Sequence, residues 1–172
     1  NSDRCHISVH RAESAAERER LLEFVPVSAA AQGPASEGFY ACVDGEFVGG
    51  GWVARGFCDD PPVGLRVLLA PHQCWFHTAK IDREYRRLGV FSHILDFVHS
   101  GLDDDADSLV MFNRLNRGSV ALAERHGLES VGTIQILRLF GVTWCRPRGG
   151  VQANRRVVWG MKRRRIEIHV PE

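Results

Sequence analysis

The sequence lacks any long hydrophobic run, because none of its apolar stretches approaches the roughly 18 to 20 residues that a membrane-spanning helix requires. It also lacks a basic segment followed by an apolar one at its start, the pattern that directs proteins to secretion. From these two absences we expect a protein that does not associate with membranes and resides in the cytoplasm.

Cysteine is scarce and irregularly placed. The chain has five cysteines, an odd number, and no two of them form a CxxC pair. This pattern argues against a disulfide framework and against a structural zinc site, so we expect no bound metal. The five positions are Cys5, Cys42, Cys58, Cys74 and Cys145.

An excess of charge of one sign is also missing, since 22 basic and 21 acidic residues give a formal net charge of +1. This balance gives no electrostatic case for nucleic acid, which we do not expect as a partner. Residues 145–172 differ, because they contain eight Arg and Lys against two Glu, a local charge of +6. We interpret this segment as a solvated or structural edge. An acidic ligand, or a nucleic acid held by residues 162–165, is the alternative.

The same segment contains a short alternating pattern. Ile166, Ile168 and Val170 recur with a period of two around Glu167 and His169. Such alternation is typical of a strand with one buried face, and we expect an edge strand here.

What the sequence does contain suffices for one globular domain over residues 1–172. Of its 172 residues, 44% are hydrophobic and 25% are charged, which excludes a disordered chain. Strands and helices follow one another in an order that predicts a mixed α/β domain around one sheet. The expected elements are strand 7–9, helix 12–24, a loop or weak helix at 28–38, strands 39–43 and 46–54 joined by the turn Asp44-Gly45, a loop at 57–62, strands 64–69 and 74–81, helix 90–100, an acidic turn at 103–107, strand 109–112, helix 117–126, and late strands at 128–140 and from 157 onward, separated by a loop at 146–154.

Two sets of apolar residues are expected to pack inside the protein or along its edges rather than to bind ligands. They are the helical stripe Phe91, Ile94, Leu95 and Val98, and the tryptophans Trp52, Trp144 and Trp159.

Residues 81–92 are the segment in which binding chemistry is expected. A strand ends there, a basic turn containing Gly89 follows, and an amphipathic helix begins. The first amides of that helix have no intrahelical partners, the helix dipole favours negative charge, and a glycine allows close approach of a ligand. Such a turn can bind a phosphate or pyrophosphate, although neither Gly-Lys-Ser/Thr nor GxGxxG is present. An ordinary strand-to-helix turn is the alternative.

The residues of this turn resemble the signature of a known family. Arg86-x-x-Gly89-x-Phe91 is similar to the Arg/Gln-x-x-Gly-x-Gly/Ala motif of the GNAT acyltransferase superfamily, with Ile81 ending its fourth strand. The hairpin at 44–50 and the Asn-containing helix from Asn116 to 128 resemble further family segments, in matching order. The resemblance covers about residues 7–139, and residues 140–172 add late strands and the basic C-terminal segment.

The resemblance implies a GNAT-like α/β (α+β) domain with a central mixed, mostly antiparallel sheet flanked by helices. It also implies an enzyme that moves an acetyl or other short acyl group from acyl-CoA to an amine by direct transfer. Main chain near Ala79 and Ile81 would pair with the pantetheine arm, where the fourth and fifth strands splay apart. Asn116 would hydrogen-bond the pantetheine or the fifth strand, and N-capping of its own helix is the alternative. The signature places the pyrophosphate on the backbone of Arg86, Arg87, Leu88, Gly89, Val90, Phe91 and Ser92.

Two positions depart from the family pattern. The second small residue of the signature is Phe91, whose bulk would narrow the space beside the phosphates. The tyrosine that often protonates the departing thiolate, seven residues after the Asn, is Ala123. The thiolate could leave unassisted, since a thiol with a pKa of about 8.5 is a tolerable leaving group. A catalytically weak or inactive CoA-binding or regulatory module is therefore the alternative function.

A general base for the transfer works best with a pKa near 7, which suits histidine. His77 lies four residues before Ile81, and strand alternation would put it on the same face as Trp75, Ala79 and Ile81. We take His77 as the candidate base, and a half-buried His with a structural partner as the alternative. Glu84, acting through a water molecule, is the second candidate, with a surface carboxylate as its alternative.

A metal site at His72, Cys74 and His77 is not expected, because strand alternation sends Cys74 and His77 to opposite faces. Cys74 is better interpreted as a buried structural thiol than as a nucleophile. The acceptor is not identified by the sequence; we expect it near residues 28–38 or 146–154, and a homodimer is one expected assembly.

Overall fold

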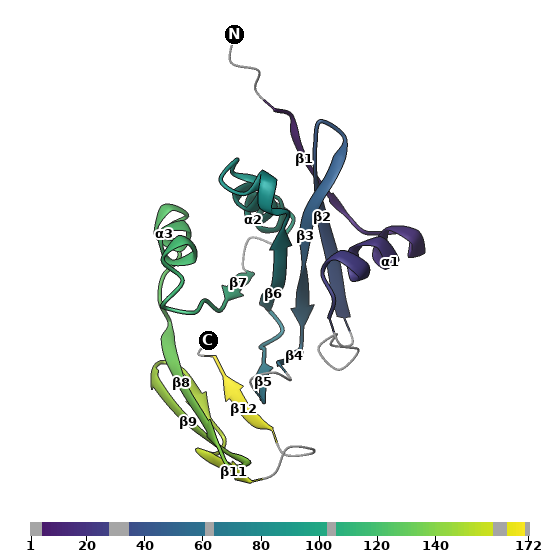
Figure 1. The fold of residues 1–172 in the computed structure, drawn as a ribbon. Helices are drawn as coiled ribbons and strands as arrows, with labels where there is room; N and C mark the ends of the chain where they lie inside the picture. Colours follow the sequence, from purple (N-terminus) through teal and green to yellow (C-terminus); the bar gives the residue numbers. More distant parts are fainter. Residues whose placement is uncertain (1–4, 28–34, 61–63, 103–105, 160–164, 171–172) are drawn as a thin grey trace.

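The computed structural model describes residues 5–27, 35–60, 64–102, 106–159 and 165–170, and Figure 1 shows their arrangement. The elements are β1 (Ile7–Arg11), α1 (Ala15–Phe24), β2 (Ala35–Val43), β3 (Glu46–Arg55), β4 (Phe57–Asp60), β5 (Leu65–Leu68), β6 (Gln73–Ile81), a 3₁₀ turn η1 (Arg83–Tyr85), α2 (Val90–Ser100), β7 (Asp107–Val110), α3 (Arg117–Arg125), β8 (Gly132–Leu139), β9 (Val142–Gly149), β10 (Gln152–Ala153), β11 (Val157–Trp159) and β12 (Ile166–His169).

The main sheet has five strands in the order β1-β2-β3-β6-β7. All neighbours are antiparallel except β6 and β7, which run parallel. α1 packs on one face through Leu21 against Trp52, and α2 packs on the other through Ile94 and Val98. This is an α+β fold with a mixed, mostly antiparallel sheet flanked by helices, as predicted.

α1 begins where its first turn is capped. Ser14 accepts a hydrogen bond from the amide of Glu17, and the carboxylate of Glu17 accepts one from the amide of Ser14. These bonds satisfy amides that a helix start leaves unpaired, so the helix begins at Ala15 rather than at residue 12 as predicted. The pKa of Glu17 is lowered to about 2, mainly by the hydrogen bond from the backbone amide of Ser14 and next by the one from the Ser14 hydroxyl.

The β2–β3 hairpin follows the turn prediction. Asp44 and Gly45 have φ angles of 51° and 85°, the left-handed conformation that a two-residue hairpin turn needs. β2 is longer than expected, because it begins at Ala35 and pairs with β3 down to Arg55. The predicted loop at 28–38 is therefore wrong for residues 35–38, and residues 28–34 lie outside the described part of the chain.

α2 has the predicted bounds, with Gly101 as its C-cap. Val90, Ile94 and Val98 are buried against the sheet, and Phe91 and Leu95 pack at the margin of the same cluster. The predicted core stripe is confirmed. With 11 residues, α2 is the longest described helix, and none in the described part of the chain is long and apolar enough to span a membrane.

The later strands form two further sheets. One has the order β10-β12-β5-β4 and the other β11-β9-β8. They enclose a separate apolar cluster made of Leu65, Cys145, Val151, Val158, Ile166 and Ile168. In Figure 1 these sheets lie below the main sheet, beyond the ends of β3 and β6.

Several loop predictions are wrong in this region. Residues 57–60 form β4 instead of a loop, and residues 146–149 and 152–153 belong to β9 and β10. Asp107 begins β7 rather than ending a turn, and β7 stops at Val110 instead of residue 112. In each case pairing with another strand stabilises an extended backbone that carries local turn residues: β4 pairs with β5, β9 with β8, β10 with β12 and β7 with β6. Residues 61–63 and 103–105 lie outside the described part.

The C-terminal strand is interior, not an edge. β12 lies between β10 and β5 and runs parallel to β5, and Ile166 and Ile168 are both 1% exposed. A buried carboxylate anchors the start of β12. Asp59 on β4 forms ion pairs with Arg66 on β5 and with Arg165, which directly precedes β12. Residues 165–170 are therefore structural, as expected, whereas residues 162–164 lie outside the described part.

The tryptophans divide between core and surface. Trp52 is fully buried, as predicted. Trp144 is 40% exposed and Trp159 is 72% exposed, so neither is a core residue, and Trp159 lies on the edge strand β11. They lie on the outer face of the β8–β9–β11 sheet.

The substitution Asp59→Asn tests the anchor of the C-terminal strand. It removes a buried charge that holds two arginines, so we expect the free energy of unfolding to fall by roughly 2–3 kcal/mol. Urea unfolding measures this loss, with the exposed Glu129→Gln as the matched control. An unfolding midpoint equal to that of the wild type would contradict the anchoring role.

Candidate functional site

The candidate site begins where two parallel strands part. β6 pairs with β7 only from Gln73 to Phe76, and the last pair joins Phe76 to Val110. β6 continues for five residues to Ile81, and no strand of the described residues pairs with its backbone there on the side away from β3. Figure 1 shows β7 turning away from β6 toward α3. The predicted splay between these strands is therefore present, and it offers unpaired backbone groups to an extended ligand.

A β-bulge interrupts β6 inside this gap. His77 pairs with Trp52 and Lys80 with Gly50, so Thr78 and Ala79 both stand opposite the single residue Gly51. Thr78 has a φ of 48°, in the left-handed region that side chains avoid. A bulge leaves one residue outside the ladder and reverses the alternation beyond it.

The reversal corrects the predicted orientation of His77. His77 shares a face with Trp52, its cross-strand partner on the α1 side, and with Trp75 two residues earlier. Ile81 packs in the cluster under α2, and Ala79 lies on that same side. The expectation that His77 shares a face with Ala79 and Ile81 is therefore wrong. The bulge places the imidazole and the signature turn on opposite sides of the sheet.

Glycines on β3 permit this close approach. A side-chain carbon on Gly49 would lie 2.5 Å from the carbonyl oxygen of Lys80, and one on Gly51 would lie 2.8 Å from Cζ of Phe76. Glycine inside a strand often marks a bulge or a close backbone contact. The run from Gly49 to Gly51 is the sequence signal that could have predicted the bulge.

His77 is half-buried and neutral. Its Nδ1 lies 3.1 Å from the hydroxyl oxygen of Thr78, and its Nε2 is buried with no hydrogen-bond partner in the described structure. Burial lowers the pKa of His77 from 6.5 to about 4. The imidazole is thus neutral at neutral pH and a weak base, because its pKa lies below the value near 7 that was expected.

The turn before α2 has the geometry of an anion site. Gly89 is the N-cap of α2 with a φ of 85°, and Arg87 also has a positive φ, 75°. No side chain caps the first amides of α2. These amides of Val90, Phe91 and Ser92 therefore remain available to a negatively charged group.

Phe91 does not crowd this turn. Its ring packs against Phe76 with centroids 5.5 Å apart, in an edge-to-face arrangement on the sheet. The expectation that its bulk narrows the space beside the phosphates is therefore wrong. The nearest group to a side-chain carbon on Gly89 would be the ring of His93, at 3.9 Å, so the cap is open.

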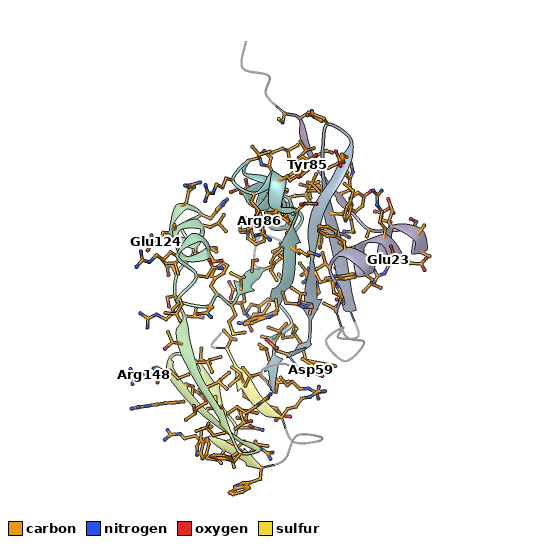
Figure 2. All side chains as sticks on the ribbon, viewed as in Figure 1. Glu23, Asp59, Tyr85, Arg86, Glu124 and Arg148 are labelled. Atoms are coloured by element: carbon orange, nitrogen blue, oxygen red, sulfur yellow. The ribbon has the colours of Figure 1, made fainter. Side chains whose placement is uncertain are left out.

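Two side-chain hydrogen bonds hold the turn before α2 in place. Nε of Arg86 donates to the carbonyl of Ile81 over 3.2 Å, and the hydroxyl of Tyr85 donates to Glu46 over 2.8 Å. The bond to Glu46 raises the pKa of Tyr85. Arg87 and Leu88 are exposed, as is Glu84 within η1. Arg86 therefore ties the end of β6 to the turn, a structural role that the signature did not reveal. Figure 2 labels both Arg86 and Tyr85.

α3 follows the end of β7 on the other side of the gap. The side chain of Asn116 accepts from the amide of Ser119 over 3.3 Å, so it caps α3, and the alternative expectation for this residue is confirmed. His126 at the end of α3 lies 3.4 Å from Asp96 of α2 and thereby links the two helices. Sequence reasoning missed this contact, for which the sequence contains no local signal.

Cys74 does not have the surroundings of a reactive thiol. Cys74 is fully buried under α2, and burial raises its thiol pKa. It faces away from His77, as the alternation predicted. Among the described residues, no group of three or more His, Cys, Asp or Glu is placed to hold a metal.

A hollow of about 560 Å³ lies elsewhere, between the end of α2 and the strands β1, β2 and β3. It is lined by the ion pairs of Glu37 with Arg11 and Arg55 and by Phe97. None of the predicted site residues contributes to it. The candidate site is the strand gap, not this hollow.

Comparisons with known proteins agree on the fold. No protein-family model matches the sequence, and no curated protein does. Among solved structures, AAC(6')-Iy in complex with the bisubstrate analogue CoA-S-monomethyl-acetylneamine matches with a TM-score of 0.55 and 15% identity, over 78% of this chain and 98% of that one. A ribosomal-protein-alanine N-acetyltransferase from Brucella melitensis matches at 0.50 and 18%, over 78% and 99%.

One matched structure is described as a transcriptional regulator and not as an acetyltransferase. A transcriptional regulator from Bacillus halodurans matches with a TM-score of 0.54 and 10% identity, over 78% of this chain and all of that one. The chain therefore has the GNAT acetyltransferase fold, as its motifs predicted. At these identities the likeness establishes the fold, and the activity has to be argued from the site.

The burial of His77 predicts a pH dependence of stability. Between pH 6.5 and about 4 the unfolded chain protonates this histidine while the folded chain does not, so stability falls as the pH drops through this window. We expect His77 to contribute a loss of roughly 2–3 kcal/mol. Urea unfolding across this pH range measures it.

The variant His77→Gln should remove this loss, whereas His99→Gln on the exposed surface of α2 should keep it. An identical pH dependence of unfolding in His77→Gln and the wild type would refute the lowered pKa.

Proposed function

We propose that the protein is an acyl-CoA-dependent N-acyltransferase that moves an acetyl or other short acyl group to an amine by direct transfer. The observation that carries the proposal is the gap between β6 and β7, which opens beside the uncapped start of α2. Unpaired strand backbone suits the amides of a pantetheine arm, and a free helix N-terminus suits a pyrophosphate. Together they fit the two ends of one acyl-CoA molecule.

Each part of acyl-CoA has candidate partners. The pyrophosphate binds the amides from Arg87 to Ser92, and the pantetheine runs along the free edge of β6 at Ala79. The carbonyl of Ile81 already accepts from Arg86, so Ile81 contributes less there than its neighbours. Asn116 uses its oxygen as a cap, which leaves its amide nitrogen as a donor toward the gap. The enzyme is a single domain over residues 1–172, since β12 completes a sheet with β5.

The transfer requires a neutral amine at the thioester carbonyl. The amine nitrogen bonds to the carbonyl carbon, the carbon–sulfur bond breaks, and CoA leaves as a thiolate. The buried, unpartnered Nε2 of His77 supports its role as the acceptor of an amine hydrogen. With a pKa of about 4, His77 orients the amine more than it stores the proton, which passes to solvent. Glu84, exposed beside the turn, is the second candidate base.

The acceptor amine is the open part of the proposal. The matched structures include a ribosomal-protein-alanine N-acetyltransferase and a protein in complex with a bisubstrate analogue that joins CoA to acetylneamine. An aminoglycoside and a peptide with an N-terminal alanine are therefore the first two acceptors to test. The location of the protein in the cytoplasm and its assembly as a homodimer remain proposals of the same kind.

A second candidate function is a CoA-binding module with little or no catalysis. Two observations favour it: the low pKa of His77, and Ala123 on α3 in the place of a general acid. The two functions differ in turnover but not in CoA binding, so separate assays of each distinguish them.

The variant Gly89→Val tests the binding turn. The positive φ makes a valine strained here, a cost that the control below shares, but no atom beyond the adjacent backbone lies closer than 3.9 Å to its side-chain carbon. The side chain would occupy the space that a phosphate needs, so we expect CoA affinity to drop by about tenfold or more. Isothermal titration with CoA measures the effect. Gly45→Val is the matched control, because Gly45 has the same φ of 85° and equally open surroundings in a remote turn. Unchanged affinity in a folded Gly89→Val protein would remove this turn from the site.

The variant His77→Ala tests catalysis. Loss of the acceptor nitrogen should lower turnover by roughly 10²-fold while the affinity for acetyl-CoA barely changes. A thiol-release assay with the two acceptors measures turnover, and His72→Ala, just before β6, is the control. An ordinary histidine acting as base would make the rate rise with pH between about 5 and 8. Because the pKa of His77 is about 4, titration of His77 should cause no such rise in this range.

Normal turnover in His77→Ala would exclude His77, and Glu84→Gln would then test the second base. Tight CoA binding by the wild type without turnover of any amine would favour the binding module instead.

A further inference from the structure

The outer face of the β8–β9–β11 sheet carries apolar and aromatic side chains in two adjacent rows. The strand register places Leu137, Trp144 and Val157 in one row, and Leu139, Val142 and Trp159 in the next. Residues two apart on a strand share a face, so both rows lie on the same side. We call these six residues the aromatic face. The opposite side of the sheet packs Ile134, Ile136, Cys145 and Val158 into the inner cluster.

Apart from Val142, which is buried, the residues of the aromatic face are open to solvent. Trp159 is 72% exposed, Leu137 is 54% exposed and Trp144 is 40% exposed. Phe140, at the turn between β8 and β9, is 98% exposed. Clusters of large apolar side chains at the surface of a protein mark interaction sites more often than isolated ones do.

Two arginines extend the aromatic face, and the segment of sequence that forms the face carries charge of one sign. Arg146 and Arg148 follow Trp144 along β9 at two-residue spacing, so they extend the same face, and both are exposed. Figure 2 shows Arg148 on the outer side of the sheet, away from β12. From Gly132 to Arg165 the sequence has eight Arg and one Lys, and no Asp or Glu. The net charge of +1 for the whole chain does not reveal this local excess of positive charge. The expectation against nucleic acid was based on that net charge.

This charge argues against a second copy of the chain as the occupant. Two copies meeting at the aromatic face would bring Arg146 and Arg148 of both together without an acidic partner in the segment from Gly132 to Arg165. Like charges brought together at an interface oppose association. The occupant must therefore be anionic and must also offer flat, apolar surfaces to the tryptophan rings.

We propose that the aromatic face binds single-stranded nucleic acid. Bases stack on Trp144 and Trp159, and backbone phosphates pair with Arg146 and Arg148. Open strands that combine aromatic rings with arginines bind single strands in this way, because every base has a stacking face and every nucleotide a phosphate. The surface is separate from β6 and α2, so the inference does not depend on the proposed acyl transfer.

Fluorescence titration tests the proposal. The probes are a labelled oligo(U) of 12 nucleotides and a duplex RNA of 12 base pairs. Oligo(U) should quench the tryptophan fluorescence of the full chain and bind at least tenfold more tightly than the duplex. The substitutions Trp144→Ala and Trp159→Ala should each weaken binding by roughly tenfold, as loss of a stacking partner does.

The arginines have a separate readout. Affinity for oligo(U) should fall with salt, and the double variant Arg146→Gln/Arg148→Gln should reduce the logarithmic slope by about 1.4, for two lost phosphate contacts. Arg114→Gln/Arg125→Gln, at two exposed arginines outside the aromatic face, should leave affinity and slope unchanged.

Several results would overturn the proposal. One is oligo(U) affinity that survives both tryptophan substitutions, and another is equal binding of duplex and single strand. Polyglutamate that quenches tryptophan as strongly as oligo(U) would assign the face to an acidic peptide. A dimer in light scattering that Trp159→Ala dissociates would assign it to a second copy. CoA is absent from all these assays, so their outcome is independent of the acyltransferase tests.

Discussion

The parallel pairing of β6 with β7 stops after four residue pairs, and the arrangement of the candidate site depends on that stop. Beyond Phe76 the two strands lead to different helices, β6 to α2 and β7 to α3, and the carboxyl ends of both strands open onto the same gap. Among the described residues, the strand pairing of β6 past this point comes from β3 alone. There the glycines Gly49 to Gly51 let the bulge at Thr78 approach, and the bulge in turn decides which way His77 faces.

The resulting site uses backbone more than side chains. The amides at the start of α2 and the free edge of β6 are the groups suited to bind, whereas Arg86, Asp82 and Tyr85 hold the turn in shape. Backbone sites of this kind place few demands on residue identity. This explains how the fold is shared with structures only 10 to 18% identical, while no family model matches the sequence.

Local signals predicted much of the main sheet and its helices. The turn at Asp44-Gly45, the stripe of α2 and its stop at Gly101 each act within a few residues, and the structure follows them. The bulge at Thr78 and the interior position of β12 depend on partners far away in the sequence, which no local pattern encodes. For the site, the sequence located the turn at Gly89. It could not reveal that Phe91 packs inward or that burial lowers the pKa of His77, because both depend on tertiary packing.

The parallel pairing of β12 with β5 also bears on the order in which the chain becomes structured. Leu65 lies beside Ile166, about 100 residues later, and pairings this distant form slowly because a long loop must close first. During synthesis the β4–β5 hairpin therefore waits, with one edge uncovered, until residues 166–169 have left the ribosome. The main sheet has its own core and can form before that moment. β12 thus completes the second layer, and a chain without β12 would keep an open strand edge on β5 that invites aggregation.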